Sequence, residues 1–252
     1  MSFLNKVVLI TGAGSGIGEA TAVRFAKASA NLVLADLRGE TVTKSAEKCA
    51  KISKQKAIPI TADVSKTEDL KRIVDTTLNE FGKIDVVIHS AGLIILGGNI
   101  TDPNLMENFD NTMSVNLRAI VELTHLAAPA LIESKGNVVV VSSENALKVR
   151  QMMIPYAVSK AAVSHFTRCA ALDLAPQGVR VNAVLPAPII TNLGTYAGIK
   201  DEDYQKGVDL CPLKAKLETH DVAELIFFLA GDTAKAITGV NYPVDAGSLL
   251  VT

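Results

Sequence analysis

The segment Val7-Val8-Leu9-Ile10-Thr11-Gly12-Ala13-Gly14-Ser15-Gly16-Ile17-Gly18 decides the fold, because it joins an apolar strand to a glycine-rich turn and the start of a helix. Glycines in such a turn permit positive φ angles and close approach of another backbone. The first N–H groups of the helix, with the helix dipole behind them, attract a phosphate. The segment predicts a phosphate-binding βα unit, although glycines are also found in ordinary βα turns.

Composition favours a small-molecule partner. The 252 residues are 48% hydrophobic, and 25 basic against 26 acidic residues give a net charge of −1. Neither sign forms a long block, so nothing indicates binding to nucleic acid or to a membrane. The three cysteines have no metal-ligand or C-x-x-C spacing, which indicates reduced thiols. With no secretory signal and only strand-length apolar runs, a cytoplasmic location is expected.

Short β-rich runs alternate with longer amphipathic segments along the chain. The expected strands are Val7–Thr11, Asn31–Asp36, Ala57–Ala62, Asp85–His89, Val138–Ser142, Val179–Leu185 and Val240–Val244. The expected helices are Ile17–Ala28, Gly39–Ser53, Lys66–Phe81, Pro103–Ser134, Pro155–Leu174 and His220–Ala230. Apolar strands that alternate with helices are typical of a parallel sheet covered on both faces. The sequence therefore predicts an α/β fold, a doubly wound sheet of seven parallel strands.

No linker, composition break or repeat divides the chain, so residues 1–252 are expected to form one domain. The one irregular stretch, residues 186–216, follows a strand at the edge of the sheet where ligands bind. We expect it to cover the substrate, and an ordinary solvated loop is the alternative.

Acidic residues follow two of the expected strands at this edge. Asp36 comes about 20 residues after the glycine turn, where a carboxylate accepts hydrogen bonds from an adenosine ribose and would repel a 2′-phosphate. Ser15 offers no cation to such a phosphate, whereas Arg38 lies close by. Asp63 could bond an adenine amino group or only cap the next helix. The pattern favours NAD over NADP.

Tyr156 and Lys160 stand four residues apart in an expected helix, so their side chains share one face. A phenol has a pKa of about 10, which a nearby ammonium and an oxidised nicotinamide ring would lower. Tyr156 is therefore a candidate acid or base. Ser142 and Ser143 close a strand at the same edge, and the Ser143 hydroxyl could position a substrate oxygen. Taken alone, Tyr156 with Lys160 is also typical of a surface helix, and Ser142 with Ser143 is also typical of a turn.

Taken in order and spacing, these residues resemble the short-chain dehydrogenase/reductase family, and the resemblance covers essentially the whole chain. The matching residues are Thr11-Gly12-x-x-x-Gly16-x-Gly18, Asp63-Val64, Ala91-Gly92, Asn116, Ser143, Tyr156-x-x-x-Lys160 and Arg180-Val181-Asn182 leading to Pro186. The resemblance implies a Rossmann-fold oxidoreductase that binds NAD(P).

The resemblance also implies a catalytic set of Asn116, Ser143, Tyr156 and Lys160. Ser143 would polarise the substrate oxygen, and Ser143 and Tyr156 together would bind the substrate. Asn116 would bend its helix and hold a water that links the lysine to solvent. The residues expected to bind the cofactor are Gly12, Ser15, Gly16, Ile17, Gly18, Asp36, Asp63, Val64, Ala91, Gly92, Tyr156, Lys160, Pro186, Ile189 and Thr191.

The chain departs from the family pattern at three places. His89-Ser90 stands where two asparagines are usual, which removes the hydrogen bonds that those side chains make. Pro186-Ala187 replaces Pro-Gly beside the nicotinamide, and Asp245-Ala246-Gly247 replaces Asp-Gly-Gly. The four histidines share no metal-ligand spacing, so no metal site is expected.

These residues predict an oxidoreductase that transfers a hydride between NAD(H) and a secondary alcohol or ketone. An NADPH-linked carbonyl or 3-oxoacyl reductase is the alternative within enzymes, and a non-catalytic dinucleotide-sensing protein is the alternative of another class. An apolar substrate is expected from the residues on the pocket side, which are Ile94, Ile95, Leu96, Ala187, Ile189 and Leu193.

Two expected helical segments are apolar over more than one stripe, Val115–Ile132 and Ala157–Leu174. Their apolar residues are Leu117, Ile120, Val121, Leu123, Leu126, Val163, Phe166 and Leu172. A helix apolar over a wide arc has to bury a second face, and a symmetry-related copy can cover it. With the second interface that the resemblance implies for residues 239–252, a homotetramer is expected, or else a dimer.

Overall fold

A single parallel sheet runs through the computed structural model, which describes residues 2–251. Its seven strands lie in the order β3-β2-β1-β4-β5-β6-β7. They are β1 (Val7–Thr11), β2 (Asn31–Asp36), β3 (Ala57–Thr61), β4 (Val86–His89), β5 (Asn137–Val141), β6 (Arg180–Pro186) and β7 (Asn241–Val244). All the neighbouring pairs are parallel. The predicted doubly wound sheet is therefore confirmed.

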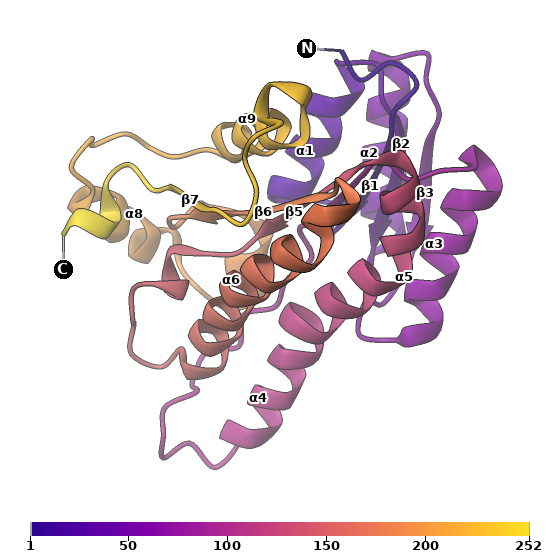
Figure 1. The fold of residues 1–252 in the computed structure, drawn as a ribbon. Helices are drawn as coiled ribbons and strands as arrows, with labels where there is room; N and C mark the ends of the chain where they lie inside the picture. Colours follow the sequence, from indigo (N-terminus) through magenta and orange to yellow (C-terminus); the bar gives the residue numbers. More distant parts are fainter. Residues whose placement is uncertain (1, 252) are drawn as a thin grey trace.

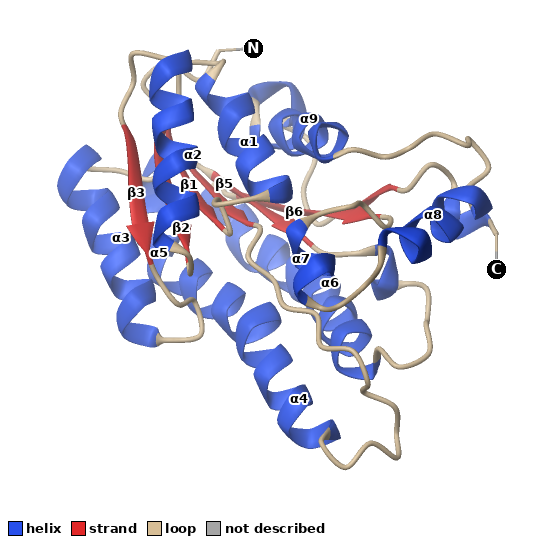
Figure 2. Ribbon diagram, turned by 180° about the vertical axis from the view of Figure 1, so that it is seen from behind, coloured by secondary structure: helices blue, strands red, loops and turns tan. Residues whose placement is uncertain are grey.

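Helices cover both faces of the sheet (Figures 1 and 2). Packed on one face are α1 (Gly16–Ala26), α2 (Gly39–Ile52) and α9 (Thr219–Ala230). Packed on the other are α3 (Thr67–Phe81), α5 (Ala119–Ser134) and α6 (Ile154–Leu174). A strand can contribute side chains to both layers, because successive side chains point to opposite faces. In β1, Val8 and Ile10 join the first layer and Leu9 joins the second.

The strand order creates a crevice beside the carboxyl end of β1. This strand pairs with β2 on one side and with β4 on the other, with Leu9 opposite Val33 and Val87 respectively. The connections after β1 and β4 therefore leave in opposite directions, and such a switch point is where ligands bind in open α/β sheets.

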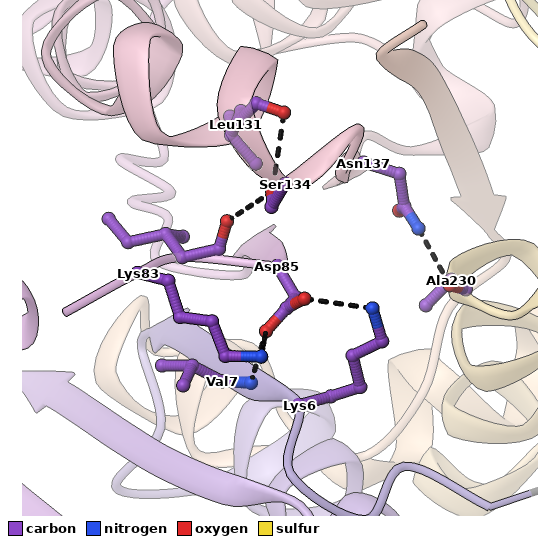
Figure 3. A network of polar contacts seen from close by, with 9 residues as sticks. Lys6, Val7, Lys83, Asp85, Leu131, Ser134, Asn137 and Ala230 are labelled. Atoms are coloured by element: carbon purple, nitrogen blue, oxygen red, sulfur yellow. Dashed lines mark hydrogen bonds and ion pairs between the residues drawn. The ribbon is translucent and has the colours of Figure 1, made fainter. Parts of the chain in front are cut away.

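The amino ends of the strands carry a polar network of their own (Figure 3). The Asp85 carboxylate accepts hydrogen bonds from Lys6 Nζ at 2.9 Å and from the Val7 N–H at 2.8 Å, and it pairs with Lys83 Nζ at 3.0 Å. Burial alone would raise the pKa of Asp85, but these partners together hold it below its ordinary value. The network ties β1 to β4 at the edge opposite the crevice.

The predicted helix Pro103–Ser134 is interrupted. It begins at Leu105 as α4 (Leu105–Met113), widens into the π-helical turn η1 (Ser114–Arg118) and continues as α5. By length and mean hydropathy alone, Leu105–Ser134 is long and apolar enough to span a membrane, although polar and charged residues interrupt its apolar runs. In the fold, its α5 part lies against the sheet, and Leu123 and Leu131 are fully buried.

The stretch 186–216 contains more regular structure than its sequence indicated. It holds the short helix α7 (Asn192–Tyr196) and the helix α8 (Asp201–Leu210). Tyr204 of α8 and Cys211 after it are buried, whereas their neighbours on α8 are mostly exposed. One buried position per two turns is too sparse a pattern to be read as a helix from sequence.

Candidate active site

The glycine turn fits closely into the crevice. Gly12 and Gly16 have φ angles of 67° and 58°, the left-handed region that glycine adopts without strain. A Cβ on Gly12 would lie 2.6 Å from the Ala91 nitrogen, and a Cβ on Gly18 would overlap the Gly12 carbonyl oxygen. Ser15 precedes α1 without capping it through its side chain. The predicted roles of Gly12, Gly16 and Gly18 in close packing thus have a structural basis.

Asp36 ends β2 beside this turn. Its Oδ2 accepts a hydrogen bond from the Gly14 N–H at 2.9 Å, and its Oδ1 accepts one from the Arg38 N–H at 3.0 Å. The Arg38 guanidinium does not pair with Asp36 but stacks on the Tyr196 ring, 3.7 Å from its centroid. Asp36 therefore lies at the crevice, while Arg38 is held against α7.

Asp63 forms a local turn after β3. Its Oδ1 accepts hydrogen bonds from the Ser65 N–H at 3.0 Å and from the Ser65 hydroxyl at 2.7 Å. Asp63 does not cap α3, because Lys66 is the N-cap residue and α3 has no side-chain cap, so the capping alternative is wrong. The same loop carries Val64 at the carboxyl edge of the sheet. Contact of either residue with an adenine stays a prediction.

The loop after β4 connects the glycine turn to the predicted catalytic residues. The Ala91 N–H donates to Thr11 Oγ1 at 3.4 Å. A Cβ on Gly92 would lie 3.7 Å from Asn116 Oδ1 and 3.8 Å from Lys160 Nζ. Any group bound against Gly92 would therefore meet the Lys160 ammonium.

His89, in place of the usual asparagine, is bonded into the helical layer. Its Nε2 lies 3.0 Å from Thr124 Oγ1, and the Thr124 hydroxyl donates to the Ile120 carbonyl at 2.7 Å. Thr124 is thus the acceptor and His89 Nε2 the donor. Burial lowers the pKa of His89 to about 3, so the ring is neutral.

Asn116 lies in the π-helical turn η1 and is fully buried. Its Oδ1 accepts from the Leu93 N–H at 2.7 Å, and its Nδ2 donates to the Leu93 carbonyl at 2.9 Å and to Ser159 Oγ at 3.1 Å. The side chain thereby fixes the loop after β4 to α6. The widened turn agrees with the bend that the resemblance implied.

The two serines after β5 have different surroundings. Ser142 Oγ donates to the Lys160 carbonyl at 3.1 Å and lies 3.1 Å from Ser164 Oγ, so it packs behind α6. Ser143 Oγ accepts the Asn145 N–H at 3.2 Å. The hydrogen bond between Ser143 and Tyr156 lowers the pKa of the phenol, as expected when the serine O–H donates to it. Ser143 is therefore the serine that faces Tyr156.

Tyr156 and Lys160 are both buried in the first turns of α6. Burial, with smaller contributions from nearby Tyr204 and Glu144, outweighs the effect of Ser143 and raises the pKa of Tyr156 to about 12. Burial lowers the pKa of Lys160 to about 8. Lys160 Nζ lies 5.6 Å from the centre of the Tyr156 ring and donates to the Val141 carbonyl at 2.9 Å. The expected lowering of the phenol pKa is therefore not produced by the protein alone.

The segment after β6 closes over the glycine turn. Pro186 ends the strand, Ile189 is buried, and a Cβ on Gly16 would lie 3.4 Å from Thr191 Cγ2. Ile17, in the first turn of α1, packs against the same apolar cluster as Ile189. The predicted cofactor residues of both segments therefore come together.

Of the predicted pocket residues, Ile94, Ile95 and Leu193 are half-buried, Leu96 is exposed and Ala187 is buried.

Sequence reasoning missed two residues of this region, Glu144 and Tyr204. Glu144 directly follows Ser143, is 1% exposed and pairs with Arg150 at 2.7 Å. Tyr204 comes from α8, within the stretch read as irregular, and acts on the pKa of Tyr156. A charged residue next to the predicted catalytic serine was the available signal for Glu144. Nothing in the local pattern distinguished Tyr204.

Other polar groups offer no competing site within residues 2–251. No cluster of three or more metal-ligating side chains occurs in this range. Cys49 and Cys211 are buried free thiols, and Cys169 is an exposed one. Burial raises the pKa of Cys49 to about 11, which keeps that thiol protonated and unreactive.

Comparison with known proteins gives matches along nearly the whole chain. Residues 12–248 match the family model described as enoyl-(acyl carrier protein) reductase. Glucose 1-dehydrogenase of Gluconobacter oxydans is 34% identical, over 98% of this chain and 93% of that protein. Meso-2,3-butanediol dehydrogenase of Serratia marcescens is 35% identical, over 98% of this chain and 96% of that protein. The structure of 3-ketoacyl-(acyl-carrier-protein) reductase from Brucella melitensis, solved with NADH, superposes with a TM-score of 0.88 at 32% identity, over 98% of this chain and 99% of that one.

Proposed function

Because the chain belongs to the short-chain dehydrogenase/reductase family, we propose that it is an NAD-dependent oxidoreductase that interconverts a secondary alcohol and a ketone. The observation that carries the proposal is the convergence of Ser143, Tyr156 and Lys160 beside Gly92 at the carboxyl edge of the sheet. A hydroxyl, a phenol and an ammonium lie together there.

The residues of the crevice fit a nicotinamide dinucleotide. Gly12 and Gly16 adopt the positive φ angles of the turn that leads into α1, and the N–H groups and dipole at the start of that helix would favour a pyrophosphate. Asp36 would hold the adenosine ribose, and Lys160 the nicotinamide ribose. Asp63 and Val64 would contact the adenine. Ala91, Gly92, Pro186, Ile189 and Thr191 would line the remaining length of the cofactor.

Asp36 supports NAD over NADP. Its carboxylate lies beside the glycine turn, where it would accept hydrogen bonds from an adenosine ribose and repel a 2′-phosphate, and Ser15 supplies no compensating charge. Arg38, a nearby cation that argues for NADP, stacks on Tyr196. The similar reductase from Brucella melitensis was solved with NADH, which also agrees with NAD. An NADPH-linked carbonyl or 3-oxoacyl reductase remains the alternative if Arg38 leaves Tyr196 and turns toward the ribose.

A nicotinamide cofactor held in the crevice, with its ribose at Lys160, would supply hydride transfer to or from the carbon that carries the substrate oxygen. Ser143 donates a hydrogen bond and would hold the substrate oxygen in place of the Tyr156 oxygen that it now contacts. Tyr156, with its pKa raised to about 12, keeps its proton at pH 7 and is suited to donate it during ketone reduction. In the oxidation direction it must lose that proton, and the charge of Lys160 would favour this loss.

Asn116 and Ser159 form hydrogen bonds that hold the start of α6 in place. Asn116 donates to Ser159 Oγ, which donates to the Tyr156 carbonyl at 2.7 Å. These bonds fix the first turn of α6, from which Tyr156 and Lys160 project. Asn116 would thereby also support the path by which a proton reaches Lys160.

The proposal includes an apolar substrate, which the segment 186–216 would cover. Ile94, Ile95 and Leu193 would contact the body of the substrate.

Exposed Val121, Ile132, Val158 and Leu172 on α5 and α6 support a two-fold interface, within a homotetramer or a dimer. The free thiols support a cytoplasmic location.

The test is turnover of a panel of secondary alcohols and ketones with NAD and NADP side by side, followed at the reduced-nicotinamide absorbance band. The proposal expects turnover with NAD at least tenfold faster in kcat/KM than with NADP. Cofactor binding without turnover of any compound would favour a dinucleotide-sensing protein. Preference for NADP would replace the cofactor assignment by the reductase alternative.

A further inference from the structure

Arg38 is a cation beside the expected ribose site, and its side chain is held by a residue of the segment 186–216. The Arg38 backbone is fixed, because its N–H donates to Asp36 Oδ1 at 3.0 Å and its carbonyl accepts a hydrogen bond from the Thr41 hydroxyl at 3.0 Å. The guanidinium lies 3.7 Å from the centre of the Tyr196 ring. No ion pair joins it to a carboxylate among the side chains that the structure describes. The stack on Tyr196 is therefore the contact that sets the direction of the Arg38 side chain.

Tyr196 reaches Arg38 from the other side of the crevice. Arg38 follows β2 and Tyr196 ends a helix that follows β6, and the strands β1, β4 and β5 lie between β2 and β6 in the sheet. The carboxyl ends of these parallel strands share one edge, which the chain has to cross to make the stack. Thr191 lies against the glycine turn on the way, since a Cβ on Gly16 would be 3.4 Å from Thr191 Cγ2. Residues 191–196 therefore span the expected cofactor site from the glycine turn to the end of β2.

The helix that carries Tyr196 is anchored independently of Arg38. Gly194 of α7 packs against the buried Tyr204 of α8, because a Cβ on Gly194 would overlap the Tyr204 hydroxyl oxygen. The Gly194 carbonyl also accepts a hydrogen bond from the Ile199 N–H at 2.9 Å. The Tyr196 ring itself is 55% exposed, so its replacement leaves the core intact. The Arg38 guanidinium can therefore turn toward another partner only by breaking the stack.

We propose that Tyr196 is a cofactor-specificity residue, which favours NAD(H) by holding the Arg38 guanidinium in the stack and away from a 2′-phosphate. This inference rests on the proposed function and deepens it, since it assigns part of the cofactor choice to α7 in addition to Asp36. An adenosine ribose with a free 2′-hydroxyl needs no cation, so NAD(H) would bind with the stack in place. A 2′-phosphate would attract the guanidinium, and that ion pair would form only after the stack is broken.

The exposure of the stack sets the size of its effect. A cation over an exposed aromatic ring contributes a free energy that corresponds to about two- to fivefold in a binding constant. This free energy opposes NADP(H) and not NAD(H), because only the phosphate draws Arg38 away. Removal of the ring is therefore expected to tighten NADPH binding by about two- to fivefold, with NADH binding changed by less than about 1.5-fold.

Fluorescence titration of the reduced nicotinamide measures this binding without turnover. The chain contains no tryptophan, so the nicotinamide emission is excited and followed directly. Dissociation constants for NADH and NADPH are measured for the wild type, Tyr196→Leu and Tyr196→Phe at one salt concentration, since exposed charges are screened by salt. Tyr196→Leu is expected to tighten NADPH binding alone. Tyr196→Phe keeps a ring under the guanidinium and is the matched control, with both constants within about 1.5-fold of the wild type.

A second background shows whether Arg38 carries the effect. Arg38→Gln removes the cation, so adding Tyr196→Leu to it should change neither dissociation constant by more than about 1.5-fold. A gain in NADPH affinity that persists without Arg38, or equal changes for both cofactors, would show that the ring acts on the cover and not on the cation. Either result overturns the inference, as does the same behaviour of Tyr196→Leu and Tyr196→Phe.

Further outcomes distinguish this inference from the proposed function. A wild type that binds NADPH more tightly than NADH contradicts the assignment of NAD, and the inference still stands if Tyr196→Leu tightens NADPH binding alone. An NADPH constant that is unchanged in Tyr196→Leu overturns the inference and leaves the proposed function standing. Absence of binding of both cofactors to the wild type overturns both.

Discussion

Replacing Lys160 by methionine is expected to stabilise the folded chain at pH 7 while it removes activity. Lys160 is 4% exposed, and its ammonium has one hydrogen bond, to the Val141 carbonyl, among the bonds found within residues 2–251. Burial disfavours a charge with so few partners. Methionine has a similar length and no charge, so it can fill the same space.

The pKa of Lys160 gives the magnitude. It falls from 10.5 to about 8 on burial, and each pKa unit is worth about 1.4 kcal/mol. The charged lysine therefore costs the fold on the order of 3 kcal/mol at pH 7. Loss of the bond to Val141 offsets about 1–2 kcal/mol of this. The variant is expected to gain about 1–2 kcal/mol in the free energy of unfolding.

The same pKa fixes the direction of the pH dependence. Between pH 8 and 10.5 the unfolded chain holds a proton on Lys160 that the folded chain has released. The free energy of unfolding therefore rises with pH in this window for the wild type, and not for the variant. The advantage of the variant should shrink by about 2 kcal/mol between pH 7 and pH 9.5.

Urea unfolding at both pH values and one protein concentration measures these differences. Lys27→Met, at an exposed position, is the matched control and should change the free energy of unfolding by less than about 0.5 kcal/mol. A Lys160→Met variant that is less stable than the wild type at pH 7, with the same difference at pH 9.5, would refute the reasoning.

Four other substitutions or measurements test the remaining assignments. Tyr156→Phe should lower kcat by about 10²–10⁴ with little change in cofactor affinity, and residual turnover within tenfold would exclude Tyr156 as the acid or base. Asp36→Ala should shift cofactor preference toward NADP by about 1–3 kcal/mol in paired kcat/KM measurements, whereas a wild type that already prefers NADP contradicts the role of Asp36. Asn116→Ala removes three hydrogen bonds to Leu93 and Ser159, so thermal unfolding should show a loss of about 1–3 kcal/mol together with lower kcat. Light scattering should give a multiple of 26.6 kDa, and a mass near that value would exclude both tetramer and dimer.

The sheet could be predicted from sequence because its strands are apolar on both faces and bounded by turns. Val7–Thr11 and Asn31–Asp36 match the structure residue for residue, and the other strands differ by one residue at one or both ends. The helix interruption at Asn116 could not be predicted from periodicity, since a π-helical turn changes the spacing by one residue without a proline or glycine to mark it.

The part of the candidate site that lies in short sequence motifs could be predicted from sequence. Ser143, Tyr156 and Lys160 meet in the structure because a strand end and a helix start are adjacent at the sheet edge. Ionisation was not predictable, because burial governs the pKa values of Tyr156 and Lys160 and depends on the whole fold. Tyr204 reaches the site from a helix far along the chain, so only tertiary structure brings it there.

Transfer of deuterium tests the central claim most directly. The enzyme is incubated with NAD and a secondary alcohol, 2,3-butanediol or 2-butanol, that carries deuterium on the carbinol carbon. Mass spectrometry then locates the label in the reduced cofactor and in the solvent. The account predicts one deuterium per molecule of NADH formed and none released to water. Deuterium found in water, or a labelled alcohol left unchanged while the cofactor is bound, would contradict direct hydride transfer by this site.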